Sequence, residues 1–230
     1  MVGVTFGTKH SYDDFGLILT SKDIGLPEPK TETTDIPGAD GELDFTEVLT
    51  DDVKYKNRKI SFTFTVKNPI GEWSTILSTI TNYLHGRTMQ VVLDVDKNFY
   101  YEGRCAVNQF KSNKATSTIV VDCNLKPYKV EVNSTSEPWK WDTFNFYSGV
   151  IYVNEVTVSG TKTVNLINRR KIVSPTFKCS AAMTVTFNGT TFNLIAGTNK
   201  VLDIRLQEGD NSVTFRGTGT VTIEYKGGSL

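Results

Sequence analysis

The apolar residues of this chain mostly follow the two-residue period of a β-strand. Between Lys59 and Val66 the residues alternate, with Ile, Phe and Val on one face and Ser and Thr on the other. Segments of similar character recur on both sides of it and predict strands near Val2–Phe6, Phe15–Thr20, Met89–Val95, Phe99–Gln109 and Thr116–Leu125. The pattern therefore predicts a mainly β fold.

One segment has the helical period instead. Its apolar stripe comprises Trp73, Ile76, Leu77, Ile80, Tyr83 and Leu84. This spacing predicts a single α-helix over about residues 72–85, with Leu77 and Ile80 facing the core. Gly86 suits the left-handed position that ends many helices. We interpret His85 as a cap whose ring nitrogen bonds the last carbonyls of the helix.

The second half of the chain predicts a separate all-β unit. Pro127-Tyr128 ends the first set of strands, and Ser134–Pro138 resembles a linker. Strands are then predicted at regular intervals, near Val173–Cys179, Met183–Phe187, Thr191–Ile195, Lys200–Leu206, Asn211–Phe215 and Thr220–Tyr225. Asn188-Gly189 between two of them is a strong hairpin signal. We expect two β-sandwich domains, residues 1–130 with the helix and residues 131–230.

An aromatic cluster lies between these domains and comprises Trp139, Trp141, Phe144 and Phe146. Such rings could form a platform on which sugars stack, or they could fill the contact between the domains. We favour the interdomain contact, because aromatic side chains beside a linker supply large buried area.

Charge and cysteine content narrow the function classes. The 25 basic and 25 acidic residues argue against a large nucleic-acid-binding patch. No apolar run reaches the length of a membrane span and none follows Met1, so we expect neither membrane insertion nor a cleaved signal. The three cysteines, Cys105, Cys123 and Cys179, are odd in number and not closely spaced. They predict small buried thiols rather than a disulfide framework.

The sequence offers no convincing catalytic or metal-binding set. It has only two histidines, and no phosphate-binding loop or nucleophile elbow is present. Asp94–Asn98 begins like a calcium loop but has Phe99 where that loop needs Gly, so a hairpin turn is the better interpretation. The acidic stretch Asp35–Glu47 is embedded in turn residues, which favours a solvated or interface loop over a hydrolytic carboxylate pair. We therefore expect no enzyme, no cofactor and no metal.

Six pieces in a set order give the chain a resemblance to a known family. Residues 1–128 resemble the distal tail proteins (Dit) of siphophages from Gram-positive bacteria. The resemblance is carried by Gly3–Leu17, Ile36–Glu47, Tyr55–Arg58 with the Phe-Thr-Phe strand after it, Asn82–Gly86, Tyr100–Arg104 and Pro127-Tyr128.

The resemblance implies a structural protein of the virion, assembled in the cytoplasm of the bacterial host. Six N-terminal domains of this family form a ring around a channel through which DNA passes. The C-terminal domain is a galectin-like sandwich that projects outward. The ring joins the tail tube protein to the tail-tip protein, a tail-associated lysin, and to the receptor-binding protein.

Two further expectations concern surfaces. The proline-bearing and turn-rich segments are suited to reaching a neighbouring copy in the ring, and their candidate interface residues are Ile24, Pro27, Pro29, Ile36, Pro37, Asp40 and Asp44. The alternative function is carbohydrate binding by the C-terminal domain during host adsorption. Residues 86–230 contain no histidine, whereas the galectin sugar site uses one.

Overall fold

The computed structural model describes residues 2–38, 40–50, 52–135 and 155–230. The chain consists of two compact units, Met1–Lys129 and Val130–Leu230. Both are built almost wholly from antiparallel strands, and the first carries one α-helix. The predicted mainly β fold with a single helix in the N-terminal part is confirmed.

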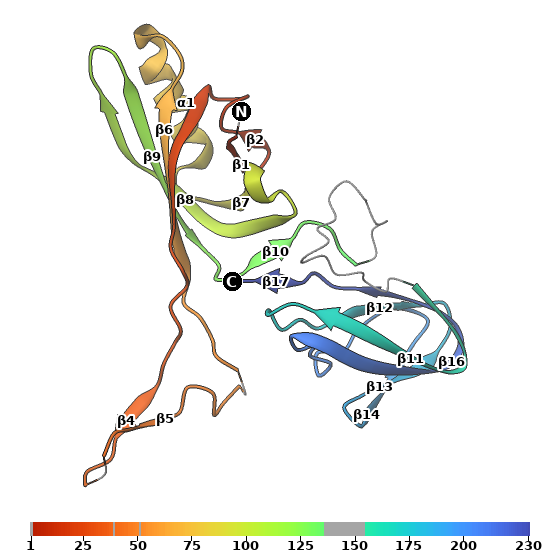
Figure 1. Cartoon of the computed structure of the whole chain (residues 1–230). Helices are drawn as coiled ribbons and strands as arrows, with labels where there is room; N and C mark the ends of the chain where they lie inside the picture. The colour runs from red at the N-terminus through yellow and green to blue at the C-terminus, as the bar shows by residue number, and fades with distance from the viewer. Residues whose placement is uncertain (1, 39, 51, 136–154) are drawn as a thin grey trace. The chain divides into compact units, whose positions relative to one another are not determined.

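Unit 1 contains one long antiparallel sheet (Figure 1) with the strand order β2-β1-β7-β8-β9-β6-β3. The strands are β1 (Val4–Phe6), β2 (Lys9–His10), β3 (Leu17–Ile24), β6 (Arg58–Val66), β7 (Arg87–Leu93), β8 (Phe99–Ser112) and β9 (Ser117–Leu125). In β6 and β9 every second side chain is buried, as their alternating sequences predict.

The sheet of unit 1 folds over on itself. Strands β1 and β6 are separated in the sheet by β7, β8 and β9. Even so, the ring centroid of Phe6 on β1 lies 5.7 Å from that of Phe62 and 6.2 Å from that of Phe64, both on β6. Rings at opposite ends of a sheet can meet only if the two ends face each other. The core of unit 1 is therefore the space between the two layers.

Helix α1 (Trp73–Leu84) contacts β7 and β8 and closes this core. A short 3-10 turn, η1 (Ile70–Glu72), precedes it, and a second, η2 (Asp94–Asp96), follows β7. Trp73, Ile80 and Leu84 are the buried residues of α1, whereas Leu77 is only half-buried. The helix was expected in this place, but its most deeply buried face is turned slightly away from Leu77.

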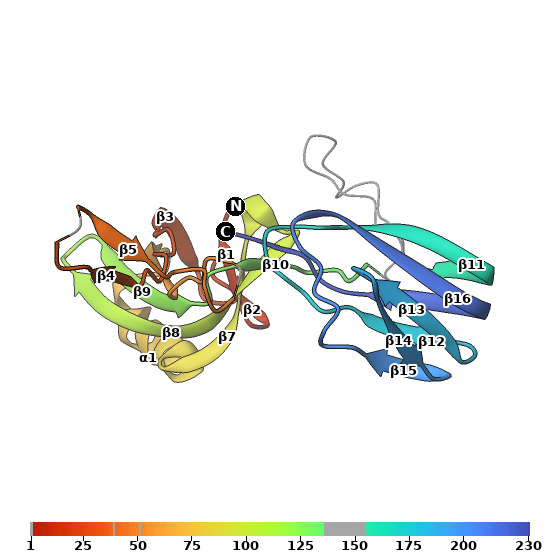
Figure 2. The same ribbon diagram turned by 90° about the horizontal axis from the view of Figure 1, so that it is seen from below.

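Unit 2 is organised around one long strand, β16 (Gly209–Glu224), which pairs from Gly209 to Thr222 with β11 (Glu155–Asn168). Figure 2 shows the two strands running side by side. The other strands are β12 (Thr176–Cys179), β13 (Met183–Phe187), β14 (Thr190–Leu194) and β15 (Gly197–Lys200). Strand β10 (Lys129–Glu131), which begins at the last residue of unit 1, pairs with β17 (Gly228–Ser229).

Glycines let β16 belong to two layers. Its first half pairs with β13 and its second half with β12. Between the halves, Gly217 and Gly219 have φ angles of 148° and 147°, and Gly160 opposite Gly217 has a φ of 78°. Residues other than glycine rarely adopt these φ angles, because a Cβ atom would collide with the backbone. Phe177 on β12 and Phe215 on β16 then meet across the core with ring centroids 5.7 Å apart.

Three local predictions are corrected by these elements. Asn211–Phe215 and Thr220–Tyr225 are parts of one strand, and the glycines between them bend it rather than end it. Residues 201–206 are not a strand, since β15 ends at Lys200. The strand β11 was not among those predicted. The Asn188-Gly189 hairpin is confirmed, with positive φ at both residues and Phe187 paired with Thr190.

Two predictions about single side chains are also wrong. Cys105 and Cys123 form a disulfide, because β8 and β9 place them directly opposite each other. The ring of His85 does not bond the last helical carbonyls, because its Nδ1 accepts a hydrogen bond from the backbone N–H of Val107. The backbone N–H of His85 does end the helix, by donating to the carbonyl of Thr81.

Candidate functional site: a projecting arm

Between β3 and β6 the chain leaves the sandwich of unit 1 as an arm, defined here as residues 25–57. Its base is a ribbon of two antiparallel segments. The backbone N–H of Gly25 donates to Lys59 at 2.9 Å, that of Lys56 to Glu28 at 2.8 Å, and that of Lys30 to Lys54 at 2.7 Å. These bonds extend the β3–β6 pairing outward, so the arm continues the sheet rather than hanging from it.

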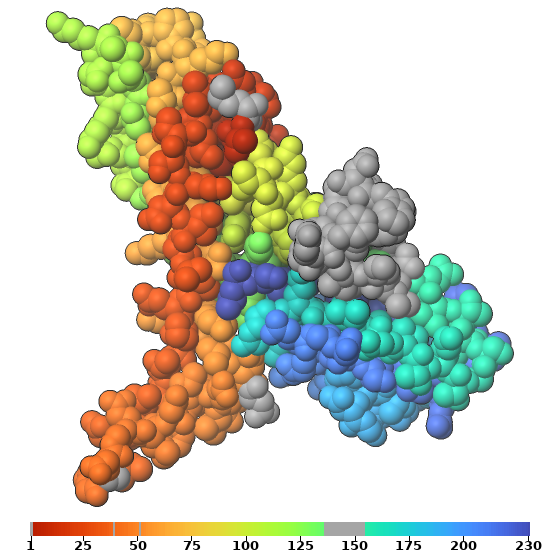
Figure 3. Space-filling model, viewed as in Figure 1, coloured from red at the N-terminus to blue at the C-terminus, as the bar shows by residue number. Residues whose placement is uncertain are grey.

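The far part of the arm is a small hairpin. Strands β4 (Thr33–Asp35) and β5 (Glu42–Asp44) pair in register and enclose the turn residues between Ile36 and Gly41. Gly38 and Gly41 have positive φ angles, which the turn requires. The expected turn-rich loop is therefore present, with a short strand on each side. Figure 3 shows this part of the arm, in orange, standing clear of the sandwich of unit 1.

The arm exposes large apolar side chains to an unusual degree. Six of the thirteen exposed large apolar residues in the described part of the chain lie in the arm, which is about a seventh of its length: Leu26, Ile36, Leu43, Phe45, Val48 and Leu49. Leu26 is 82 % exposed and Leu49 is 94 % exposed. Clustered apolar exposure of this kind marks interaction sites on proteins.

The arm is also strongly acidic. Between Thr31 and Val53 the sequence has eight Asp and Glu residues and neither Lys nor Arg. The Thr46 side chain and then its backbone N–H, which lies 2.8 Å from the Asp44 carboxylate, hold the pKa of Asp44 below its usual range. A surface that is both acidic and apolar fits a partner with apolar groups rimmed by basic side chains.

The seven candidate interface residues differ in how far they are exposed to solvent. Pro29, Ile36, Pro37, Asp40 and Asp44 are exposed on the arm. Ile24 is half-buried at the end of β3, and Pro27 is buried against its own chain. The aromatic cluster of Trp139, Trp141, Phe144 and Phe146 lies outside the described residues.

Besides the arm, unit 1 has a surface pocket of about 810 Å³, which lies on the outer face of the sheet near the base of the arm. Four of its polar side chains form hydrogen bonds or ion pairs in this region: Ser61, Glu102, Asp122 and Lys126. Asp122 accepts hydrogen bonds from Ser61 at 2.7 Å and from Asn108 at 2.5 Å, and Lys126 forms an ion pair with Glu102 at 2.9 Å.

Within the described ranges, no group of three or more His, Cys, Asp or Glu side chains is placed to hold a metal ion. No helix in the same ranges is long and apolar enough to cross a membrane.

Comparisons with known proteins find a similar fold but no similar sequence. No family model matches the chain, and no curated protein matches it. Among solved structures, the chain matches the SPP1 Dit (gp 19.1) protein, described as a paradigm of hub adsorption apparatus in phages infecting Gram-positive bacteria. The TM-score is 0.63 and the identity is 12 %, over 98 % of this chain and 99 % of that one.

The chain has the fold of a phage distal tail protein.

Because the match spans almost the whole of both chains, it includes both units. The distal tail protein fold, expected from short motifs within residues 1–128, is thus confirmed at an identity too low for sequence comparison to detect. Some of these motifs occupy turns of the fold. Pro37-Gly38 and Asp40-Gly41 shape the hairpin turn, and Gly86 follows the helix with a φ of 76°.

Sequence reasoning missed the most exposed residues of the arm. Leu26, Val48 and Leu49 were not among the candidates, although they are more exposed than Ile36. A signal was present, because these apolar residues fall in a segment of Pro, Gly and acidic residues with no strand or helix period. Apolar residues that follow no strand or helix period do not form a face that packs into the core. Such residues are therefore candidates for a surface that binds a partner.

Proposed function

We propose that this chain is a structural protein of a phage tail tip. Copies of it form a six-membered ring that joins the tail tube protein to the tail-tip protein and the receptor-binding protein. The ring encloses a channel for DNA in passage, and the protein belongs to the virion. The proposal is supported by the fold shared over the full length with the SPP1 Dit protein. The observation that supports it most directly is the arm, which projects from the sandwich and exposes apolar side chains.

The arm explains how a ring could close. A cyclic assembly needs one patch to meet a different patch on the next copy. The arm supplies the first patch, because it leaves the sandwich and presents Leu26, Val48 and Leu49 to solvent. A hairpin of this size is marginal by itself. Packing on a neighbour would bury its apolar side chains and stabilise its paired segments.

The charge of the arm predicts how the contact responds to salt. The eight acidic residues between Thr31 and Val53 would be complemented by basic side chains on the receiving surface. Attraction between exposed charges is screened over about 8 Å at physiological ionic strength and over about 3 Å at 1 M. We expect ring formation to weaken as salt rises, while the apolar contacts retain part of the affinity.

The test is the mass of the full-length protein in solution, measured by native mass spectrometry over a range of concentrations. The wild type is expected to form hexamers as concentration rises. Replacing Leu26, Val48 and Leu49 with Ser should shift the protein to monomers, because it removes apolar contact without touching the sandwich core.

A matched control uses apolar residues of similar exposure elsewhere. Ile195 and Leu202 of unit 2 are 69 % and 66 % exposed. The variant Ile195→Ser with Leu202→Ser should form hexamers like the wild type. The proposal fails if the wild type remains monomeric at every concentration, both alone and with tail tube protein, or if the arm variant assembles normally.

A further inference from the structure

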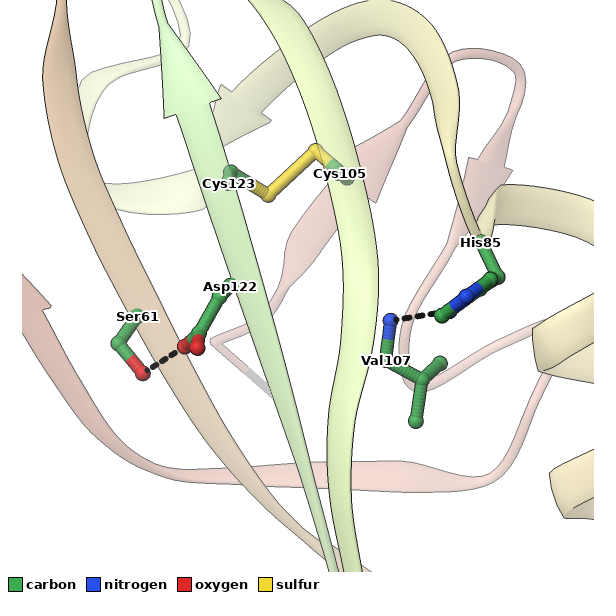
Figure 4. Close-up of a disulfide and its surroundings, with 6 residues drawn as sticks. All are labelled: Ser61, His85, Cys105, Val107, Asp122 and Cys123. Atoms are coloured by element: carbon green, nitrogen blue, oxygen red, sulfur yellow. Dashed lines mark hydrogen bonds between the residues drawn. A yellow bond between two sulfur atoms is a disulfide. The ribbon is translucent and has the colours of Figure 1, made fainter.

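Strands β8 and β9 carry a feature that the proposed function does not use. Cys105 and Cys123 are directly opposite each other in the register, with Cα atoms 4.0 Å apart, and their sulfur atoms are bonded (Figure 4). Both are buried in the core of unit 1. The bond closes the hairpin over a separation of 18 residues.

This pair sits where several elements are joined. Beside Cys105, the backbone N–H of Gly86 donates to the Cys105 carbonyl at 2.8 Å, and the N–H of Val107 donates to His85 at 3.2 Å. These bonds attach the end of α1 to β8. Beside Cys123, Asp122 accepts the hydroxyl of Ser61 on β6, as Figure 4 shows. Fastening β8 to β9 therefore also holds the helix and the strand that leads out of the arm.

The third cysteine supplies an internal reference. Cys179 is a free thiol buried in unit 2, whereas the pair lies in unit 1. Burial raises the pKa of its thiol, which lowers the fraction of reactive thiolate. A loss of two thiols that disappears in the variant Cys105→Ala with Cys123→Ala can then be assigned to Cys105 and Cys123.

We propose that Cys105 and Cys123 form a redox latch on the β8–β9 hairpin. The pair is a dithiol while the chain is made among cellular thiols, and a disulfide once the chain is in an oxidising medium. The proposal rests on the proposed function, since a phage tail protein is made inside a cell and acts outside it. Disulfides persist in extracellular surroundings and are rare where glutathione keeps thiols reduced.

The closing reaction is a thiol–disulfide exchange with a low-molecular-weight disulfide such as glutathione disulfide. One cysteine thiolate attacks a glutathione sulfur, forms a mixed disulfide and expels one glutathione thiolate. The second cysteine, after losing its proton, attacks the protein sulfur and expels the second glutathione. Two electrons pass from the cysteine pair to glutathione, and the two protons lost by the cysteines are taken up by the two glutathione thiolates.

Burial determines when this exchange can occur. Neither sulfur can meet glutathione while the hairpin is closed, because both residues lie inside the core. Exchange requires folding or a local opening of β8 from β9. Once closed in the folded protein, the latch should resist added reductant.

The test begins with full-length protein refolded from denaturant in buffers of different glutathione to glutathione disulfide ratio. Free thiols are then alkylated under denaturing conditions and counted by intact mass. We expect three alkylated cysteines in the thiol-rich buffer and one, Cys179, in the disulfide-rich buffer. A count of three in every buffer, or of one in every buffer, would overturn the latch.

Stability gives an independent readout. Closing a loop of this size should raise the unfolding temperature of the oxidised protein by about 10 °C over the reduced protein. The variant Cys105→Ala with Cys123→Ala should lose the difference between the two buffers, and Cys179→Ala should keep it. Comparing each variant with itself removes the effect of the substitution on core packing. The latch is also overturned if the wild type unfolds at one temperature in both buffers.

These measurements use the isolated protein and do not depend on its assembly. If the thiol count switches but no hexamer forms at any concentration, the proposed ring fails while the cysteine chemistry stands. If hexamers form in both buffers but the thiol count never switches, the latch fails and the ring stands.

Discussion

Helix α1 shows how far burial differs between neighbouring apolar residues of one stripe. Ile80 has no exposed surface, and Leu84 has almost none. Leu77, two turns before Leu84, keeps part of its side chain in solvent. Truncating the two positions should therefore cost different amounts, although their sequence contexts look alike.

We expect Ile80→Ala to lower the free energy of unfolding by about 2–5 kcal/mol, because it leaves a cavity under the helix. Leu77→Ala should cost about 1 kcal/mol, since less of the side chain leaves an apolar environment. Denaturant unfolding of both variants measures the difference. Equal losses at the two positions would mean that the helix is rotated from the orientation described here.

The cysteines and His85 show that residue type and local pattern do not determine the bonding partner of a side chain. Burial of Cys105 and Cys123 was predicted correctly from the alternation of their strands. Their bond was not, because it depends on the register between β8 and β9, and a shift of one residue would separate the sulfurs. His85 was placed correctly at the helix end, but its partner comes from β8, 22 residues away.

At the scale of elements, the bend in β16 decides how unit 2 is layered. A Cβ added at Gly217 would lie 2.7 Å from the Cβ of Met183 and 3.3 Å from its Cα. A Cβ added at Gly160, on the paired strand, would have no heavy atom within 4 Å. The φ angle of Gly160 is 78°, near the left-handed region, whereas that of Gly217 is 148°, so Gly217 is both more crowded and farther from the angles that other residues adopt.

Gly160→Ala should accordingly cost about 1–2 kcal/mol, the price of the left-handed conformation alone. Gly217→Ala should cost more, because the added methyl group also pushes β13 away from β16. Thermal unfolding of the two variants compares them directly. A smaller loss at Gly217 than at Gly160 would show that β13 moves aside without difficulty.

At the scale of the whole molecule, the two compact units suggest a division of labour. The arm comprises residues 25–57, and the three backbone hydrogen bonds described at its base join residues of unit 1. If ring formation depends on the arm, unit 2 should be dispensable for it.

A fragment of residues 1–129 should therefore form hexamers at high concentration, as judged by native mass spectrometry, and should be folded by circular dichroism. The matched control is the same fragment with Leu26, Val48 and Leu49 replaced by Ser, which should stay monomeric. A folded fragment that never assembles, beside a fragment of residues 130–230 that does, would contradict this division.

The sequence by itself determined the class of fold, the position of the helix, the Asn188-Gly189 hairpin and the turn of the arm. All of these depend on contacts between residues close in the chain, which leave a period or a turn signature. Only the tertiary structure decided which ends of the sheet face each other, that Cys105 meets Cys123, and that β16 bends through two layers. It also decided which arm residues remain exposed. Such outcomes depend on strand register and on packing between distant segments, and no local pattern records either.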